Sequence, residues 1–505
     1  MKNKIISALA VALITLPSFG KQSLVYDITD YGAKGDSTTL NTKYIQLAID
    51  AAAKAGGGTV YVPNGVFITG TIFLKSNTTL RLAEGGKLLG SPHIEDYTEL
   101  TWGHNVDRQP YHLVCSIDQE NVSIEGRGTI DGNGRYFWQD YEKDAEGRMV
   151  TPRWLLPKNK KVSPLIEMVR CQNVTVRDVN IKTGGGWNLH VHDCDLVKIQ
   201  GVNIVNNIYS PNSDGIDITG CHDVIVSDCY IKTCDDAVCL KTTDDSRDCQ
   251  RVTVTNCVIE TLCVGLKMGC TESFKPMSDV TFSNCIINKS SRAIGIYVKE
   301  DADYNNISIN NIVANTNAPL VLNRPIIIMA HRTDSTKSFG KIRNVVISNF
   351  ICETEGRIIL SAEEGCAIEN VTLRDIMLRY PYIEDPRRYT DGPGSAQYPD
   401  ERRHPDVGNA QAAVVANNID NLVVDNLVVD WPTTDATPIE WSHPERIENG
   451  TMEVHRPDYS RARQTEMQLL WGRNLRGGYL HCPLSVASNG APKYHLDKST
   501  IRVTE

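Results

Sequence analysis

The sequence predicts an all-β fold, a single-domain right-handed parallel β-helix with an N-terminal capping helix. Short strands with alternating apolar residues recur along most of the chain, and several begin 22 or 28 residues apart, at Val174, Leu196, Val224, Val252 and Val280. A polar break and a second strand follow each of them. Almost no segment in this region has the roughly 3.6-residue apolar period of a helix. A regular period of this length, built from strands, is typical of a stack of β-coils.

The polar break between paired strands holds only Gly, Asn or Asp. The residues at this position are Asp178, Gly201, Asp228, Asn256, Asn284, Asn311, Asn349, Asp375 and Asn426. These residue types tolerate a positive φ, and Asn and Asp also bond to their own backbone. One such residue per coil turns the chain at the same place each time. We therefore expect successive coils to stack at the strand spacing of about 4.8 Å.

The two ends of the chain depart from the repeat. Residues 1–20 place Lys2 and Lys4 before a short apolar run, which is typical of a secretory signal peptide and predicts an exported protein, periplasmic or secreted. Residues 21–450 are expected to form the β-helix, with a cap helix over residues 41–54 and Asn41 as its N-cap. Residues 451–505 lose the coil pattern and are expected to form a C-terminal capping tail.

Composition and cysteine positions narrow the class of protein. The net charge of −9 gives no sign of nucleic-acid binding, and no later segment is long enough for membrane insertion. Among the fifteen cysteines, Cys229, Cys257 and Cys285 stand 28 residues apart in matching contexts. This spacing favours a column of buried free thiols over disulfides. The protein is expected to be a monomer.

The strongest chemical signal lies in residues 212–241. Asp214 and Asp236 are 22 residues apart, close to the length of one coil, so we expect them to lie side by side with Asp235 next to them. Carboxylates this close resist joint ionisation, and one is expected to stay protonated near neutral pH. Glycosidic cleavage needs this combination, since one acid protonates the leaving oxygen and another activates water.

Strand alternation places further polar side chains on the same outer face. Aligning four strand segments puts Asp217 and Lys267 in one outward column, with Tyr297 beside Lys267, and puts Lys241 in the column of Lys299. Clustered carboxylates can also bind Ca²⁺. The neighbouring lysines would compete with a cation, however, and no metal or cofactor is predicted.

These residues carry a resemblance to glycoside hydrolase family 28, the polygalacturonase family of pectin hydrolases. The matching segments are YGAKGD from Tyr31, GGGTVYVPNG from Gly56, GTIDGNG from Gly128, WNLH from Trp187, NSDGID from Asn212 and CDDAVCLK from Cys234. The resemblance implies that Asp235 is the general acid and that Asp214 and Asp236 hold and activate the water. It also implies that cleavage inverts the anomeric centre.

Two motifs depart from the family pattern. The Gly-His-Gly motif falls on residues 263–265, where Val264 replaces the His. The Arg-Ile-Lys motif falls on residues 297–299, where Tyr297 replaces the Arg and Lys299 is kept. In the family this Arg and Lys grip a galacturonate carboxylate, so plain homogalacturonan becomes a poorer candidate substrate. The lysines near the acids still favour an anion, and we expect a branched or mixed pectin such as rhamnogalacturonan.

The predicted partner is therefore an acidic plant cell-wall polysaccharide or oligosaccharide. The predicted substrate-binding residues are Lys299, Lys267, Tyr297, Lys241, Asn212, Asp217 and His190. Tyr297 is expected to stack on a sugar face. Insertions at residues 89–113, 131–164 and 377–415 are expected to help build the binding face. Two alternatives stay open, a Ca-dependent pectate lyase-like eliminase and a non-catalytic glycan-binding β-helix.

Overall fold

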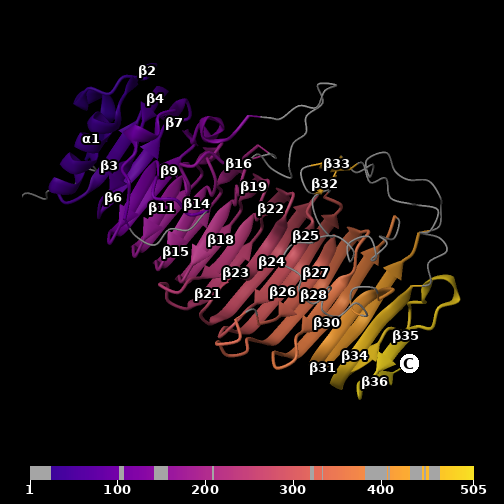
Figure 1. Ribbon diagram of the computed structural model, residues 1–505. Coiled ribbons are helices and arrows are strands. Elements are labelled where there is room, and N and C mark those ends of the chain that lie inside the picture. Colours follow the sequence, from indigo (N-terminus) through magenta and orange to yellow (C-terminus); the bar gives the residue numbers. More distant parts are fainter. Residues whose placement is uncertain are drawn as a thin grey trace, which may run out of the picture.

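The structure, a computed structural model, is a long parallel β-helix whose coils stack from one end of the chain to the other (Figure 1). It describes residues 24–101, 107–140, 157–207, 210–318, 323–332, 334–381, 407, 410–432, 446–448, 451–453 and 467–504. Within these ranges one sheet of 34 strands winds around the core, and every pairing in it is parallel. The predicted right-handed parallel β-helix is confirmed.

Coils in the first half of the chain contribute short strands, typically three to a coil. These strands are β1 (Val25–Asp27), β2 (Asp36–Leu40), β3 (Gly58–Val62), β4 (Gly65–Thr69), β5 (Ile72–Leu74), β6 (Thr78–Leu82), β7 (Gly86–Gly90), β8 (Val114–Ile117), β9 (Glu120–Gly126), β10 (Thr129–Asp131), β11 (Ile166–Val169), β12 (Gln172–Arg177), β13 (Asn180–Lys182), β14 (Leu189–His192), β15 (Asp195–Gln200), β16 (Asn203–Val205), β17 (Ile216–Thr219), β18 (His222–Ser227), β19 (Tyr230–Thr233), β20 (Val238–Thr242), β21 (Cys249–Thr255) and β22 (Val258–Thr261). Each strand from β6 to β20 pairs with the strand three positions later, so that β14 lies beside β17 and β17 beside β20.

In the second half two of the faces merge into one long strand. The change comes at β24 (Met277–Asn288), which pairs with both β21 and β22. The other strands of this half are β23 (Val264–Ser273), β25 (Arg292–Val298), β26 (Asp303–Thr316), β27 (Arg324–Ala330), β28 (Lys341–Thr354), β29 (Ile358–Ala362), β30 (Ala367–Arg379), β31 (Ala412–Asp430), β34 (Gln468–His481), β35 (Tyr494–Asp497) and β36 (Arg502–Thr504). A separate antiparallel hairpin pairs β32 (Arg446–Glu448) with β33 (Thr451–Glu453).

The break residues turn the chain as the sequence predicts. All nine have a positive φ, between 52° and 64°. Their side chains also bond from coil to coil: Asn311 Nδ2 donates to Asn284 Oδ1 at 3.0 Å, and Asn426 Nδ2 donates to Asp375 Oδ1 at 2.7 Å. The same residues therefore set the turn within each coil and link neighbouring coils along the axis.

A helix covers the N-terminal end of the stack (Figure 1). This helix, α1 (Thr42–Lys54), buries Ile45, Ala48, Ile49 and Ala52 against the first coils, and the predicted cap helix is confirmed. Asn41 is the N-cap residue, as predicted, but its side chain does not cap the helix. Asn41 makes no capping bond, because its Oδ1 accepts the backbone N–H of Lys34 at 2.7 Å.

Inward side chains form one continuous apolar core along the axis. Cys229, Cys257 and Cys285 are buried in it, and all fifteen cysteines are free thiols. The prediction of buried free thiols is confirmed for this column. Small thiols fill one place in successive coils without a covalent link between them.

The coil pattern does not end at residue 450. Strand β34 pairs with β31 over most of its length, and β35 and β36 add to β34. The prediction that a capping tail replaces the coils after residue 450 is therefore wrong for residues 468–504. The pattern was hidden because the break column ends at Asn426: the residue opposite it on the next coil is Cys482, which is not Gly, Asn or Asp and has no positive φ.

Three sequence predictions concern segments that lie partly or wholly outside the described residues. The signal peptide over residues 1–20 lies outside the described residues, as do residues 141–156 and 382–406 of the two longer insertions. Across the described parts of the chain, no helix has the length and apolar character needed to span a membrane.

Candidate active site

The predicted acids lie on the outer face of one sheet, which we call the site sheet. It runs through β11, β14, β17, β20, β23, β25, β27, β29, β31 and β34. Ile216 pairs with Val238, and Gly215 N donates to Asp236 O at 2.9 Å, so the chain entering β17 runs beside the chain entering β20. The predicted adjacency of Asp214 and Asp236 is therefore confirmed.

Four carboxyl groups gather at this place: Asp214, Asp217, Asp235 and Asp236, the acid cluster. The Asp236 backbone N–H donates to Asp235 Oδ1 at 3.1 Å, and Asp214 is subject to the charges of the other three. All four are buried, but Asp235 is the most exposed at 8%, against 3% for Asp214 and 2% for Asp236. Asp235 is thus the member that an entering molecule reaches most readily.

Lys241 sits within the acid cluster. Its Nζ is 3.1 Å from Asp217 Oδ1 and 3.4 Å from Asp214 Oδ2. The indole of Trp187 covers this ammonium, with 3.5 Å between Nζ and the ring centre. Lys241 was predicted to bind substrate, and the structure instead shows it neutralising two carboxylates while an aromatic face shields it. A direct substrate contact by Lys241 stays a prediction.

Lys267 is engaged with the third acid. Its Nζ donates to Asp236 Oδ2, and the side chain is largely buried. Burial opposes ionisation of Asp236, but the charge and hydrogen bond of Lys267 outweigh it and hold the Asp236 pKa below its usual value. The ionised form of Asp236 is therefore favoured.

Asp214 has the opposite character. Burial, and then the charge of Asp217, raise the Asp214 pKa well above its usual value, and Lys241 only partly offsets them. The prediction that crowding keeps one carboxyl protonated fits this result. The raised pKa belongs to Asp214, whereas the family resemblance assigns the acid role to Asp235.

The predicted register is confirmed from β20 to β23, where Cys239 pairs with Lys267, and is wrong by two residues from β23 to β25. Lys267 pairs with Gly295, and Tyr297 pairs with Gly269, so Tyr297 is not beside Lys267. Lys299 follows the end of β25, where its N–H donates to Ser273 Oγ at 2.9 Å, and it does not share a column with Lys241. A shift of two leaves every side chain on the same face, so the alternating pattern could not reveal it.

The Tyr297 ring packs among protein side chains. It is 2% exposed in an apolar cluster on the outer face of the site sheet, with Cys270, Ile327, Met329 and Ile359 among its members. The predicted stacking of Tyr297 on a sugar face is not what the structure shows, because these side chains occupy its surroundings.

His190 belongs to a buried polar network on the coil before the acids. Its Nδ1 is 2.8 Å from Glu167 Oε2 and its Nε2 is 2.9 Å from Thr219 Oγ1, while Arg108 pairs with the same Glu167. Both ring nitrogens therefore have protein partners. His190 was predicted as a substrate contact, and the structure gives it the role of a support beside Asp217, with which it pairs in register.

Lys161 is the residue that sequence reasoning missed. It lies in the second insertion, is 1% exposed, and its Nζ has no hydrogen-bond partner among the described residues. Burial lowers its pKa, while the carboxylates of Asp107, Asp214 and Asp235 act to raise it. A buried ammonium thus faces the acid cluster with its donors unused. The sequence offered only a run of lysines at 158, 160 and 161 with nothing to single one out.

One group of ligand atoms has the spacing of a metal site. Atoms of Asp235, Asp236 and Cys263 lie within 4.8 Å of one another. The ammonium of Lys267 already occupies an oxygen of Asp236, and a cation bound there would have to displace it. Asn212, the remaining predicted site residue, is partly exposed at the turn before Asp214, with a φ of 47°.

Comparison with known protein families shows the family to which this chain belongs. The model of glycosyl hydrolases family 28 matches residues 60–388, well over half of the chain and all of the acid cluster. The chain belongs to glycosyl hydrolases family 28. The match also covers every predicted substrate-binding residue, because these residues lie between His190 and Lys299.

Individual relatives of this family-28 chain match over shorter stretches. A probable polygalacturonase from Vitis vinifera is 30% identical over 253 residues, 48% of this chain and 48% of that protein. An exo-poly-α-D-galacturonosidase from Dickeya chrysanthemi is 31% identical over 253 residues, 42% of this chain and 41% of that protein. The chain thus spans less than half the length of these relatives. The solved exopolygalacturonase from Thermotoga maritima superposes with a TM-score of 0.63 at 21% identity, covering 81% of this chain and 92% of that one, which shows a common fold.

Proposed function

We propose that this family-28 chain hydrolyses glycosidic bonds in pectic, galacturonate-containing polysaccharides with inversion at the anomeric carbon. The observation that carries the proposal is the acid cluster, four buried carboxyl groups close together, with Lys241 paired to Asp214 and Asp217 and Lys267 paired to Asp236. Such a cluster keeps a proton on one group and leaves another ionised, as a general acid and a general base require. The printed names of the Vitis and Dickeya relatives support the same class of substrate.

Asp235 takes the role of general acid in this proposal, and Asp214 and Asp236 hold the attacking water. The greater exposure of Asp235 supports its contact with the glycosidic oxygen. Lys267 keeps Asp236 ionised and therefore able to accept a proton from water. Burial and the charges of the neighbouring acids favour a proton within the cluster, and Asp235 must carry one when it acts as the acid.

The substrate is acidic because the site offers a cation that the protein does not use. The Lys161 ammonium is buried, close to the acid cluster, and has no hydrogen-bond partner among the described residues. A galacturonate carboxylate would supply that partner through a charge-assisted bond. Tyr297 stands where the family has an Arg, so one grip on galacturonate is lost, and a mixed pectin such as rhamnogalacturonan suits the site better than homogalacturonan.

The test is hydrolysis of a panel of pectic polymers by the purified protein and by its Asp235→Asn variant. Loss of the general acid should lower kcat by about 10²- to 10⁴-fold while galacturonate still binds. The anomer that forms first, observed by NMR, reports inversion or retention. Full activity in Asp235→Asn would overturn the assignment.

The same experiment separates the two alternatives. A Ca-dependent eliminase would form an unsaturated product that absorbs in the ultraviolet and would stop in EDTA, whereas hydrolysis gives reducing ends without that absorbance. A glycan-binding β-helix would bind the polymers and cleave none of them.

We also propose that the protein is exported and monomeric. The basic start and short apolar run of residues 1–20 support export. The N-terminal sequence of the protein recovered from periplasm or medium tests the first point, and sedimentation equilibrium tests the second. An N-terminus that begins at residue 1, or a mass of two chains, would refute the respective proposal.

A further inference from the structure

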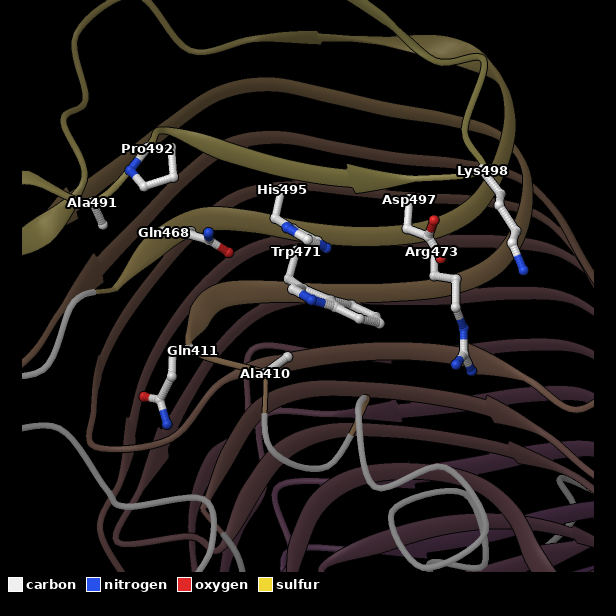
Figure 2. Close-up of a pocket in the computed structure, with 10 residues that line it drawn as sticks. All are labelled: Ala410, Gln411, Gln468, Trp471, Arg473, Ala491, Pro492, His495, Asp497 and Lys498. Carbon is white, nitrogen blue, oxygen red and sulfur yellow. The ribbon is translucent and has the colours of Figure 1, made fainter.

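We propose that a pocket at the C-terminal end of the site sheet is a second binding site, for an acidic saccharide. The pocket has a volume of about 630 Å³, and its walls include Trp471, Arg473, His495 and Lys498. In Figure 2, Arg473 and Lys498 lie at one end of the hollow, Gln411 and Gln468 lie at the other, and Trp471 and His495 lie between them. The choice of an acidic saccharide rests on the proposed function. The existence of the site rests on the geometry.

The pocket shares a face with the acid cluster but is well separated from it. The outward column that contains Asp217, Cys239 and Lys267 continues strand by strand to Trp471 on β34 and His495 on β35. Six pairings separate β20 from β34, which at about 4.8 Å each is roughly 29 Å. A ligand in the pocket is therefore remote from the reacting groups.

An apolar cover divides the two sites. Between them the outward column consists of Gly295, Ile327, Ile359 and Val415. The last three are buried together with Val407 and Ala410. Ala410 also forms part of the pocket wall, and Trp471 at the edge of this cluster is partly exposed. The outer face of the site sheet thus becomes accessible again at the pocket.

The pocket supplies an ordered aromatic surface. The Trp471 and His495 rings are stacked, with 5.7 Å between their centres and 8° between their planes, and His495 is exposed. Neighbouring coils hold the two rings in this arrangement, so little side-chain freedom is lost when a ligand packs against them. Aromatic surface with a few fixed polar groups is typical of small-molecule sites, and the apolar C–H faces of sugars suit it.

The polar groups of the pocket suit hydroxyls and a carboxylate. Arg473 Nε donates to Asn417 Oδ1 at 2.9 Å, and its guanidinium carbon is 5.9 Å from the Trp471 ring centre, which fixes a cation beside the aromatic pair. Lys498 adds an exposed ammonium, while Asp497 is the one acid among the described lining residues. At the other end, Gln411 Oε1 is buried and has no hydrogen-bond partner among the described residues. A sugar hydroxyl can donate to this oxygen while its carboxylate faces the cations.

The two sites together would let the protein hold one part of a pectic polymer while it cleaves another. Binding at the pocket makes the encounter between the same polymer and the acid cluster intramolecular, which raises its effective concentration. The pocket should therefore matter for long substrates and not for short ones.

The test uses calorimetric titration of the Asp235→Asn protein with trigalacturonate. We expect two binding events, and Trp471→Ala should remove one of them. Arg473→Gln should weaken the same event by about tenfold or more. Arg476→Gln, which changes an exposed arginine on the same strand paired with Asp420, is the matched control and should leave both events unchanged. If the Trp471 variant fails to fold, Arg473→Gln and Lys498→Ala carry the test.

A single binding event, or two events that survive both Trp471→Ala and Arg473→Gln, would overturn the proposal. Equal binding of the neutral trisaccharide galactotriose would overturn the acidic class. In otherwise wild-type protein, Trp471→Ala should raise KM for a long pectic polymer and leave kcat/KM for a short oligosaccharide unchanged. A failure of the proposed hydrolysis would appear as no cleavage of either substrate, and the calorimetry would still decide whether the pocket binds.

Discussion

Replacing Lys161 with Met should lower activity without lowering stability. In the ligand-free protein the Lys161 ammonium is buried and has no hydrogen-bond partner among the described residues, so it contributes desolvation cost without a compensating hydrogen bond. Burial accordingly lowers its pKa. Met has a similar length and no charge. We therefore expect the thermal midpoint of Lys161→Met to stay the same or rise, which is the reverse of a typical core substitution.

The activity effect follows from the bond that Lys161 would make to a substrate carboxylate. A hydrogen bond to a charged group contributes about 1.5–3 kcal/mol. Losing it should therefore lower kcat/KM on a galacturonate-containing substrate by about 10- to 150-fold. Lys161 also lies close enough to Asp214 and Asp235 to affect their charges, so part of the loss can come through the acids.

Two ligands separate these contributions. Galacturonate and galactose differ in the carboxylate, and their inhibition constants are measured on the wild-type protein and on Lys161→Met. We expect the constant for galacturonate to rise by the factor above and that for galactose to change little. Lys160→Met is the matched control, since Lys160 is 58% exposed and 3.9 Å from Glu99. Equal changes for the two sugars, or none, would refute a role in carboxylate binding.

Two further predictions concern stability. Burial lowers the His112 pKa from 6.5 to about 4, so the folded state favours the neutral ring. The contribution of His112 to folding stability is therefore complete above pH 6.5. It is lost as the pH falls toward 4, by up to roughly 3 kcal/mol. His112→Gln should flatten the fall of the thermal midpoint over this range, and an unchanged pH profile would contradict the assignment. Gly269 and Gly477 both have a φ of 75°, but a Cβ at Gly269 would overlap the carbonyl oxygen of Tyr297 while one at Gly477 meets nothing within 4 Å. In urea unfolding, Gly477→Ala should lower the free energy of unfolding only by the strain of a left-handed Ala, about 1 kcal/mol. Gly269→Ala should lower it clearly more. Equal losses of stability would mean that the coil relaxes at Gly269.

The fold was predictable because its signals are local and repeated. Each coil needs one residue that turns the chain at the break, and only Gly, Asn or Asp serves there, so the position of Asp228 or Asn256 marks the coil without reference to the rest of the chain. The same reasoning failed after residue 450, where Cys482 stands opposite Asn426 and no Gly, Asn or Asp marks the break. The parallel pairing of β34 with β31 therefore continues past the last residue that marks a coil in the sequence.

The acid cluster was predictable for the same reason, and its surroundings were not. Asp214 and Asp236 are one coil apart with no irregularity between them, so sequence spacing gives spatial adjacency. The 28-residue spacing still holds beyond β20, where Cys239 pairs with Lys267 and Lys267 pairs with Gly295. The predicted alignment departed from this spacing by two residues at β25, and both Tyr297 and Lys299 were therefore placed beside the wrong neighbours.

The insertions mark the limit of reasoning from a repeat. Lys161 and Trp187 both reach the acid cluster, one as an ammonium facing Asp214 and Asp235 and the other as an aromatic face over Lys241. Trp187 lies just before β14, so the coil pattern is enough to place it. Lys161 lies in an insertion that does not follow the coil repeat, so its position cannot be predicted from the spacing. The backbone repeat therefore places the acid cluster, and in the proposed function a non-repeating segment supplies the cation that selects an acidic substrate. For this reason Lys161→Met tests the substrate class more directly than any change in the coils themselves.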